Sequence, residues 1–477
     1  TRNVVLTGRS CTIPSDADML RATSVGLDLL STVPASRWTT EDLVPGLDTD
    51  VIRRSGYGAF VVDTELFDNK IFGIAPAEAG CMDPQHRLLL ERSYSAFHDA
   101  SLDKVALSGS DTGVAVGISA TDFNDILNAT PKGRSVYGAT GVGLAIASGR
   151  ISFVLGMQGP CASFETACSA SLVATHSAVR AVRYAECSAH LAAGVNLIVV
   201  PASSVALSIA GMPSPTGHSY TFDRRADGFA RGEACSTIVL QVQGTTRDLL
   251  TMRGSAVRSD GRSASLTAPN GLAQQSLLRG ALADANVVAD SVLNNEAHGT
   301  GTALGDPIET RALADVALKE RRARDGPQAT PLVIGGAKAN YGHGEAAAGA
   351  TGLLKVVYTL QSGESAPNAM LRILNPHVMP VAIEPGCSLP TQRARVRSEA
   401  SRVSEVIGGA SSFGYSGTIA HAVLSCKLAS VVSNERSIRT LRYRHKAFPW
   451  RLRKAANVRR AILAKPTDRG WNAHGFD

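Results

Sequence analysis

Hydrophobic and polar residues follow two different periods along this chain, and the switching predicts interleaved strands and helices. Apolar runs such as residues 111–119 ("DTGVAVGIS") and 235–242 ("CSTIVLQV") have the length of buried strands. Residues 276–285 ("SLLRGALADA") and 346–363 ("AAAGATGLLKVVYTLQSG") place apolar side chains at helical spacing. Strands and helices that alternate throughout a chain are typical of an α/β fold.

One long uncharged segment, residues 191–212, is the part of the chain most similar to a membrane-spanning helix. It reads "LAAGVNLIVVPASSVALSIAGM", and Asn196 and Pro201 interrupt its apolar run. A buried strand followed by a short helix explains the segment better than a spanning helix. We therefore expect no membrane span.

The positive charge of the chain lies mostly near its carboxyl end. The sequence has 477 residues and a formal net charge of +7, but residues 436–460 contain ten Lys or Arg and no Asp or Glu. The first 435 residues therefore carry a net charge of about −3. A nearly neutral body argues against nucleic acid as a partner, and the composition is that of a globular enzyme.

Eight cysteines are spread over the chain without a CxxC pair or a regular spacing. This distribution indicates neither a zinc site nor a disulfide framework, and it favours a reducing compartment. The chain begins at Thr1 without a positively charged leader, so we expect no secretory signal. We expect a cytoplasmic location, with an organelle such as a plastid as the alternative.

Cys168 stands where a short apolar run gives way to a helix. The stretch 163–182 reads "SFETACSASLVATHSAVRAV", and from Ala167 onward its larger apolar residues fall on one helical face. A cysteine in the first turn of a helix meets unpaired N–H groups and the positive end of the helix dipole, which stabilise a thiolate. Two interpretations remain open at this point: a nucleophile, or an inert cysteine packed in the core.

Two glycine-rich stretches supply histidines. Residues 295–309 ("NEAHGTGTALGDPIE") follow an apolar run and place His298 in a turn. Residues 335–349 ("GGAKANYGHGEAAAG") place Lys338 and His343 in a loop that opens a helix. A cysteine and two histidines, each at a turn after a strand, indicate nucleophilic catalysis rather than a metal site.

These stretches, in this order and spacing, resemble the β-ketoacyl synthases of polyketide synthases and type I fatty acid synthases. Further segments carry the resemblance: "MDPQHRLLLE" from Met82, "FDRRADGFARGE" from Phe222, "SLTAPNG" from Ser265 and "SSFGYSGTIAHAVL" from Ser411. The resemblance implies an N-terminal ketosynthase half at residues 1–250 with the nucleophilic cysteine. A C-terminal half at 251–425 would carry both histidines, and a basic linker or tail would occupy 426–477.

The resemblance implies a thiolase fold, an α/β fold of five layers in α-β-α-β-α order that is built from two similar halves and is usually dimeric. Cys168 aligns with the nucleophile that accepts the acyl chain in this family. His298 and His343 align with the two catalytic histidines.

Supporting roles follow from the same resemblance. Lys338 and Glu309 match a lysine and a glutamate that order the catalytic site. Tyr415 falls where an aromatic gatekeeper lends a backbone N–H. Thr300 and Thr302 match residues that hydrogen-bond the pantetheine arm of a carrier.

The implied reaction is a decarboxylative Claisen condensation of the 3-oxoacyl-[acyl-carrier-protein] synthase type. Cys168 would hold the growing chain as a thioester, with the N–H groups of Cys168 and Tyr415 stabilising the oxyanion. His298 and His343, neutral and donating through Nε2, would stabilise the enolate that forms as malonyl thioester loses CO₂. The Lys338 cation would disfavour protonation of His343. No metal or redox cofactor is required.

The expected substrates are acyl and malonyl thioesters carried on the 4'-phosphopantetheine of an acyl carrier protein, in polyketide or fatty acid elongation. No GxSxG nucleophile elbow occurs in the sequence. An acyltransferase is therefore expected in trans or from another domain. Acyl carrier proteins are usually acidic, so the basic tail would attract them.

Two alternatives differ from this interpretation in their chemistry. A catalytically silent ketosynthase-like partner that sets chain length generally lacks the cysteine or a histidine, whereas this chain keeps all three. A thiolase shares the fold but condenses without decarboxylation and uses a second cysteine as its base. The motifs around His298 and His343 argue against a thiolase.

Other polar residues in these stretches are not expected to be catalytic. His176 lies two turns into the helix after Cys168 and is expected to be packed or at the surface, and Cys161 is expected to be structural. Glu165, Gly344 and Ile419 depart from the family pattern, but they remove no reacting group and affect only pocket shape and loop stability.

The basic tail has two interpretations: a solvated arm that binds acidic partners, or a linker folded back on the body. Residues 441–451 ("LRYRHKAFPWR") resemble the linker after the ketosynthase of modular synthases, whose aromatic residues pack on the domain. We expect this segment to pack on the body. The rest of the tail is expected to contact a carrier or another linker.

Overall fold

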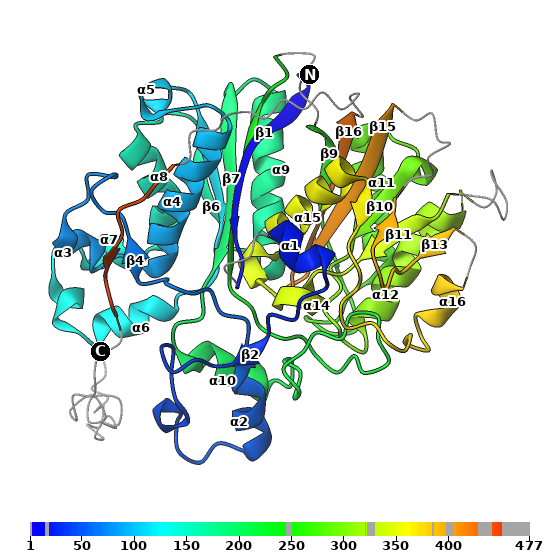
Figure 1. Ribbon diagram of the computed structural model, residues 1–477, viewed down its shortest axis with the longest axis horizontal. Helices are drawn as coiled ribbons and strands as arrows, with labels where there is room; N and C mark the ends of the chain where they lie inside the picture. Colours follow the sequence, from blue (N-terminus) through cyan, green and yellow to red (C-terminus); the bar gives the residue numbers. More distant parts are fainter. Residues whose placement is uncertain are drawn as a thin grey trace, which may run out of the picture.

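The computed structural model describes residues 2–14, 19–244, 250–319, 321, 330–383, 386–396, 404–427 and 441–450. In these residues strands and helices alternate along the chain, as the hydrophobic pattern predicts (Figure 1). Eleven of the described strands form one sheet, and the other strands form short two-stranded pairs. The large sheet divides into two parts of the same design.

The N-terminal half contributes five strands to the sheet. In spatial order they are β6 (Cys161–Phe164), β5 (Gly113–Gly117), β7 (Ala189–Asn196), β8 (Ala234–Val242) and β1 (Val4–Thr12). β5 is parallel to both β6 and β7, whereas β8 runs antiparallel to β7 and to β1. β5 and β7 are buried along their whole length, which explains their nearly continuous apolar sequences.

The C-terminal half repeats this order and these directions. Its strands are β11 (Leu332–Gly335), β10 (Val292–Glu296), β15 (Glu405–Phe413), β16 (Thr418–Lys427) and β9 (Leu250–Ser259), with β13 (Cys387–Ser388) added at the outer edge. β10 is parallel to β11 and β15, and β16 is antiparallel to β15 and β9. A short pairing of β1 with β9 joins the two halves.

Helices fill the space between the two parts of the sheet and cover both outer faces (Figure 1). The central layer holds α9 (Ala170–Arg183) and α15 (Ala348–Ser362), which contact strands of both halves. α4 (Pro84–Asp99) and α8 (Leu144–Leu155) cover the N-terminal strands, and α11 (Gly271–Ala285) packs on β9 and β16. The result is the expected five-layered α-β-α-β-α arrangement of two similar halves.

The other elements are shorter and lie around this framework. The helices are α1 (Met19–Ser24), α2 (Thr49–Ser55), α3 (Pro76–Ala79), α5 (Lys104–Leu107), α6 (Asp122–Asn128), α7 (Gly138–Val142), α10 (Pro201–Ile209), α12 (Gly305–Leu313), α14 (Lys338–Tyr341) and α16 (Met379–Ala382). The strands are β2 (Ser31–Thr32), β3 (Tyr57–Gly58), β4 (Leu66–Phe67), β12 (Glu364–Ser365), β14 (Ala394–Arg395) and β17 (Lys446–Ala447).

The uncharged segment at residues 191–212 is a strand and a short helix, as predicted. Its first part is the end of the buried strand β7, and α10 begins at Pro201, where the fixed backbone angle of proline suits the first helical turn. Within the described ranges, every helix is too short or too polar to cross a bilayer.

Residues 441–450 pack on the N-terminal half, as expected for this part of the tail. β17 pairs with β4, and the segment lies along the side of α4 (Figure 1). The hydroxyl of Tyr443 donates to the carbonyl oxygen of Glu91 at 2.7 Å, and the guanidinium groups of Arg37 and Arg87 lie 5.8 and 5.6 Å from the centre of the Trp450 ring. Arg451 and the expected carrier or linker contacts of the remaining tail lie outside the described residues.

The outer edge of the N-terminal half is an open strand. β6 pairs only with β5 in the described chain, and Cys161 and Ala162 on it are exposed. Cys161 was expected to be structural, but it is not packed in the core, because β6 is the last strand of the sheet. His176, by contrast, is half-buried and its Nδ1 lies 2.9 Å from Oγ of Ser255, in agreement with the expected packing role.

Candidate active site

Cys168 lies in a tight turn between β6 and α9, as the sequence predicts. Ala167 in this turn has a φ of +50°, a left-handed conformation that costs a residue with a Cβ about 1–2 kcal/mol. Ala167–Ser169 form the single 3₁₀ turn η3, and α9 begins at the next residue. The hydroxyl of Ser412 on β15 donates to the carbonyl oxygen of Cys168 at 2.7 Å. The C-terminal half therefore helps to fix the candidate nucleophile.

The thiol of Cys168 is protonated at neutral pH, which corrects the expectation of a stabilised thiolate. Burial raises the pKa of the Cys168 thiol to about 12, and the negative charge of Glu345 acts in the same direction. The Lys338 cation and the N–H groups of Tyr415 and Cys168 lower this pKa, but by less. Loss of hydration thus outweighs the helix terminus at this site.

The turn between β15 and β16 brings a second backbone N–H to the sulfur of Cys168. Gly414 lies so close to the cysteine turn that a Cβ there would be 2.5 Å from the carbonyl oxygen of Thr166. The N–H of Tyr415 hydrogen-bonds toward the Cys168 sulfur, whereas 52% of the Tyr415 residue is exposed. Two N–H groups that converge on one point can stabilise an oxyanion.

His298 follows β10 and is held in one tautomer by a backbone donor. The N–H of Phe413 donates to Nδ1 of His298 at 3.3 Å, which leaves the ring proton on Nε2. Burial lowers the pKa of His298 well below its usual value, and the charge of Lys338 adds to this effect. The ring is therefore neutral, with Nε2–H as a donor.

His343 has the same arrangement in the loop that precedes α15. The N–H of Glu345 donates to Nδ1 of His343 at 3.1 Å, and Nε2 is buried without a hydrogen-bond partner among the described residues. Burial and the charges of Lys338 and Arg231 hold the pKa of His343 well below its usual value. The His298 and His343 rings lie 5.3 Å apart between centroids at an angle of 84°. The neutral state expected for both histidines is thus supported.

Lys338 and Glu309 order the loop that carries His298. The buried ammonium group of Lys338 donates to the carbonyl oxygen of His298. The carboxylate of Glu309 accepts from the N–H groups of His298 and Gly299 at 2.7 and 2.8 Å. Burial lowers the pKa of Lys338, while the charge of Glu296 raises it. Both residues act on the backbone of this loop, and Lys338 also adds charge beside the histidines.

Thr300 and Thr302 lie together in the turn after His298. Their hydroxyl oxygens are 3.1 Å apart, and Oγ1 of Thr302 accepts from the N–H of Gly305. Thr302 is half-buried and Thr300 is buried. Both threonines therefore belong to the loop of the candidate site, as expected.

Asp306 holds the backbone of the candidate site, and the sequence did not identify it. Its carboxylate accepts from the N–H of Gly301 at 3.0 Å and from the N–H of Phe222 at 2.7 Å. It thus ties the threonine turn to the "FDRRADG" segment. Burial raises the pKa of Asp306 to about 6. A carboxylate directly after a glycine-rich turn was the signal that could have identified it.

Two consecutive residues at the end of β15 join the parts of the site. Ser412 contacts Cys168 through its hydroxyl, and Phe413 contacts His298 through its N–H. Because the cysteine turn η3 also packs against η7 (Glu345–Ala347), which directly follows His343, the structure brings together all three candidate catalytic residues.

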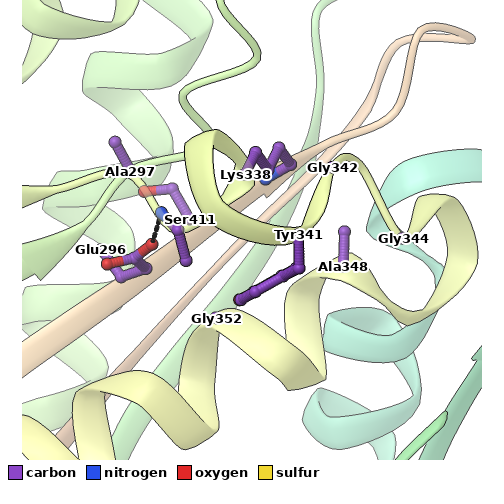
Figure 2. A pocket seen from close by; sticks show the side chains of 10 residues that line it. Glu296, Ala297, Lys338, Tyr341, Gly342, Gly344, Ala348, Gly352 and Ser411 are labelled. Carbon is purple, nitrogen blue, oxygen red and sulfur yellow. Dashed lines mark hydrogen bonds between the residues drawn. The ribbon is translucent and has the colours of Figure 1, made fainter. Parts of the chain in front are cut away.

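A small closed cavity lies behind the histidine loops (Figure 2). Its volume is about 10 Å³, which is room for about one water molecule. In Figure 2, Glu296 and Ser411 come from neighbouring strands, and Lys338 and Tyr341 come from α14. Glu296 accepts from the N–H of Ala337 at 2.6 Å and pairs with Lys355 at 2.8 Å. The cavity is too small for a substrate, and the hydrogen bonds of its lining residues help to hold the loop that carries Lys338.

The described part of the chain contains no group of three or more His, Cys, Asp or Glu residues that could hold a metal ion. The candidate site instead consists of one thiol, two neutral imidazoles, a lysine and converging backbone N–H groups. Such a set can form and break thioesters and can stabilise negative charge on a substrate oxygen.

Comparison with known protein families identifies the class. The N-terminal domain of β-ketoacyl synthases matches residues 1–244, and the C-terminal domain of the same enzymes matches residues 249–372. The chain therefore belongs to the β-ketoacyl synthase family, whose members are condensing enzymes of the acyltransferase type. More particularly, it is a ketosynthase domain of the kind found in polyketide synthases, as the following similarities show.

Curated relatives are polyketide synthases. The chain is 40% identical over 435 residues to the phenolphthiocerol synthesis polyketide synthase type I of Mycobacterium bovis, with 89% of this chain and 20% of that protein covered. It is 39% identical to the spectinabilin polyketide synthase system protein NorC of Streptomyces orinoci, with 86% and 18% covered. The chain thus spans about a fifth of the length of these relatives.

Solved structures confirm the thiolase fold. A ketosynthase from module 6 of the bacillaene synthase of Bacillus subtilis has a TM-score of 0.78 and 30% sequence identity, with 90% of this chain and 72% of that chain covered. An oxazolomycin ketosynthase domain of Streptomyces albus has a TM-score of 0.80 and 28% identity, with 90% and 74% covered. The family and fold expected from the sequence are therefore confirmed.

Proposed function

We propose that this ketosynthase performs decarboxylative Claisen condensation with Cys168 as the acyl acceptor and His298 and His343 as the enolate donors. The observation that carries the proposal is the shared tautomer of the histidines. Backbone N–H groups occupy both Nδ1 atoms, so both rings present Nε2–H. Two neutral donors suit an anion that forms in place and disappears again, because they need no proton transfer.

The first step transfers the acyl chain to Cys168. Sγ attacks the carbonyl carbon of a carrier-bound thioester, and the N–H groups of Cys168 and Tyr415 hydrogen-bond to the oxyanion that forms. The bond between the carbonyl carbon and the carrier sulfur then breaks. The thiol proton of Cys168 ends on the released carrier thiol, so the step is neutral overall. Because the pKa of the Cys168 thiol is about 12, Sγ loses this proton only during the attack.

The second step uses the two histidines. The bond to the carboxylate of a malonyl-type thioester breaks, CO₂ leaves, and the electron pair forms an enolate. Its oxygen accepts from Nε2–H of His298 and His343. The enolate carbon then attacks the thioester on Cys168, a C–C bond forms, and the Sγ–C bond breaks. The thiolate of Cys168 takes a proton from water, and the hydroxide that remains carries the negative charge that the malonyl carboxylate lost with CO₂.

Both thioesters are proposed to arrive on the 4'-phosphopantetheine of an acyl carrier protein, with Thr300 and Thr302 hydrogen-bonding the pantetheine arm. The position of both threonines in the His298 loop supports this role. Malonyl loading is assigned to an acyltransferase in trans or in another domain. None of the eight cysteines, all of which lie in the described residues, forms a disulfide, which supports a reducing compartment such as the cytoplasm.

A homodimer is also proposed, through the open edge at β6. Beside this edge lies a cavity of about 230 Å³ lined by Ile118, Leu144 and Phe164 among others. Phe153 on α8, which packs on β6, is 86% exposed. An unpaired strand with exposed apolar neighbours is a surface that a second copy can cover.

The proposed function can be tested in two half-reactions. Intact-protein mass after incubation with acyl thioesters should show one acyl group, and peptide mapping should place it on Cys168. CO₂ release from malonyl carrier protein should then depend on both histidines. Acylation of Cys161 instead of Cys168, or absence of CO₂ release, would contradict the proposal.

A further inference from the structure

An ion pair of one buried and one half-buried side chain lies next to His343 in the structure, and its side chains have no part in the steps above. Nε of Arg231 donates to Oε1 of Glu345 at 2.6 Å, and the two side chains are 4% and 19% exposed. Nη1 of Arg231 also donates to the hydroxyls of Ser203 and Ser204 at 3.0 and 2.7 Å. The guanidinium is therefore fixed on two sides, and it holds the Glu345 carboxylate in place.

Backbone groups of Glu345 and of the two residues that flank Arg231 hold His343. The N–H of Glu345 is the donor to Nδ1 of His343, and it adopts this position with a φ of +42°, which a residue with a Cβ rarely takes. On the other side, the N–H of His343 donates to the carbonyl oxygen of Ala230 at 2.7 Å, and the N–H of Gly232 donates to that of His343 at 2.9 Å. His343 thus lies between Glu345 and the segment that carries Arg231.

Glu345 begins η7, which packs against the cysteine turn η3, and its charge also acts on Cys168. Apart from burial, its charge is the largest influence that raises the pKa of the Cys168 thiol, and the Lys338 cation opposes it. Arg231 faces Asp122 and Glu233 in addition to Glu345.

Of these further carboxylates, Glu233 has its own partner, because Arg37 donates to it at 2.7 Å. Asp122 accepts from the hydroxyl of Ser203, which Arg231 also contacts. Of these three carboxylates, Glu345 is thus the one whose charge raises the pKa of the Cys168 thiol.

We propose that Arg231 and Glu345 are a positioning pair that connects the two halves of the reaction. The pair holds the N–H of Glu345 on Nδ1 of His343 and so keeps Nε2–H available for the enolate. Its carboxylate also keeps Cys168 as a thiol until an acyl thioester is bound, which protects the sulfur from oxidation and alkylation. This inference rests on the proposed function, but its first test does not need condensation.

The first test replaces the charge and keeps the contact. In Glu345→Gln, the side-chain oxygen can still accept from Nε of Arg231, and the backbone N–H is unchanged. Alkylation of Cys168 by iodoacetamide at pH 8 should become faster, by about three- to fourfold for each unit by which the thiol pKa falls, because the gain in thiolate is partly offset by its lower nucleophilicity. Peptide mapping is needed to separate Cys168 from the exposed Cys161.

The matched control is Glu405→Gln, which removes the carboxylate of another Arg–Glu pair, that with Arg253 at 3.1 Å. Glu405 begins β15 and lies at the opposite end of the strand from Phe413. Its replacement should leave the alkylation rate of Cys168 unchanged. Equal rates in Glu345→Gln and the parent would overturn the role of the charge.

The second test removes the anchor. Glu345→Ala leaves Arg231 without this partner and keeps the unfavourable φ, so CO₂ release should fall about tenfold or more while Cys168 is still acylated. Glu345→Gly permits the positive φ but also lacks the contact with Arg231, so CO₂ release should fall less in this variant than in Glu345→Ala. If both variants release CO₂ at the parental rate, the positioning role is wrong. If the parent itself releases no CO₂, the proposed function fails, while the alkylation comparison still decides the role of the Glu345 charge.

Discussion

The two halves of this ketosynthase share one topology but differ in what they place at the same point of it. In the N-terminal half, β6 is followed by η3 and α9, and the turn carries Cys168. In the C-terminal half, the equivalent strand β11 is followed by α14, η7 and α15, and this connection carries Lys338 and His343. In the proposed mechanism, a duplicated framework thus supplies the acyl acceptor from one copy and the anion-stabilising groups from the other.

The difference lies in local backbone and charge. The N-terminal turn is short and contains a single left-handed residue, Ala167, so it can present one side chain. The C-terminal connection has left-handed residues at Gly342 and Glu345 and gathers charges of both signs. Burial therefore acts on both connections in the same way, because it raises the pKa of the Cys168 thiol and lowers the pKa of His298 and His343, with the Lys338 charge lowering the histidine pKa values further.

The largest expected effect comes from a change in the N-terminal half, which should abolish one half-reaction and spare the other. Cys168→Ala should abolish acylation and condensation, because no other sulfur lies at the turn after β6. CO₂ release from malonyl carrier protein should persist, since the histidines and Lys338 remain. Intact mass and CO₂ release measure the two reactions, with Cys161→Ala as the control. An acyl group on the Cys168→Ala protein would mean that the N-terminal turn is not the acceptor.

The opposite change acts on the C-terminal half. His298→Ala or His343→Ala should reduce CO₂ release about 10²- to 10³-fold, the effect of losing one oxyanion donor. Acylation of Cys168 should continue, because the N–H groups of Cys168 and Tyr415 are intact. His176→Ala serves as the control, since its ring contacts Ser255 and not the site. Parental CO₂ release in both site variants would show that the halves do not divide the reaction as proposed.

Sequence reasoning located the residues with side-chain chemistry and failed where backbone and burial decide. The strand at residues 111–119 and the helix at 346–363 were predicted because their apolar spacing is regular, and β5 and α15 lie there. The prediction of a stabilised thiolate at Cys168 was wrong, because the sequence shows where the helix begins but not that burial removes the hydration of the sulfur.

The residues that sequence reasoning missed act through backbone groups or across long sequence distances. Asp306 accepts from the N–H of Gly301 in its own loop and from the N–H of Phe222, which lies far away in the chain. Arg231 and Glu345 are 114 residues apart, so no local pattern relates them. The roles of the matched site residues remain predictions, which the variants above would test.

The third prediction concerns pH and compares the two kinds of titratable group. Between pH 7 and 9, the rate of Cys168 alkylation should rise by about tenfold per unit, without a plateau, because the pH stays well below the pKa of about 12. CO₂ release should stay flat down to pH 6, since both histidine pKa values lie well below the usual one. A plateau of alkylation near pH 8 would mean that a thiolate is stabilised after all.

The smallest effect is expected where the two halves touch. At Gly349 on α15, a Cβ would lie 2.6 Å from Cγ of Leu172 on α9, and the hydroxyl of Ser171 accepts from the N–H of Ala350 at 3.0 Å. These helices directly follow the two functional connections. Gly349→Ala should therefore force α9 and α15 apart, at a cost of about 1–3 kcal/mol in the free energy of unfolding.

Gly352→Ala is the matched control on the same helix. Its nearest neighbour would be Cγ of Glu296 at 3.4 Å, an ordinary contact, and replacing a mid-helix glycine by alanine favours the folded state by about 0.5–1 kcal/mol. Thermal unfolding should thus begin earlier in Gly349→Ala and no earlier in Gly352→Ala. Because the separation of α9 from α15 would also move Cys168 away from the histidines, condensation should fall more than either half-reaction in Gly349→Ala. Equal losses in all three assays would show that the variant is only destabilised, and that the close contact of the helices does not set the distance between the two halves of the site.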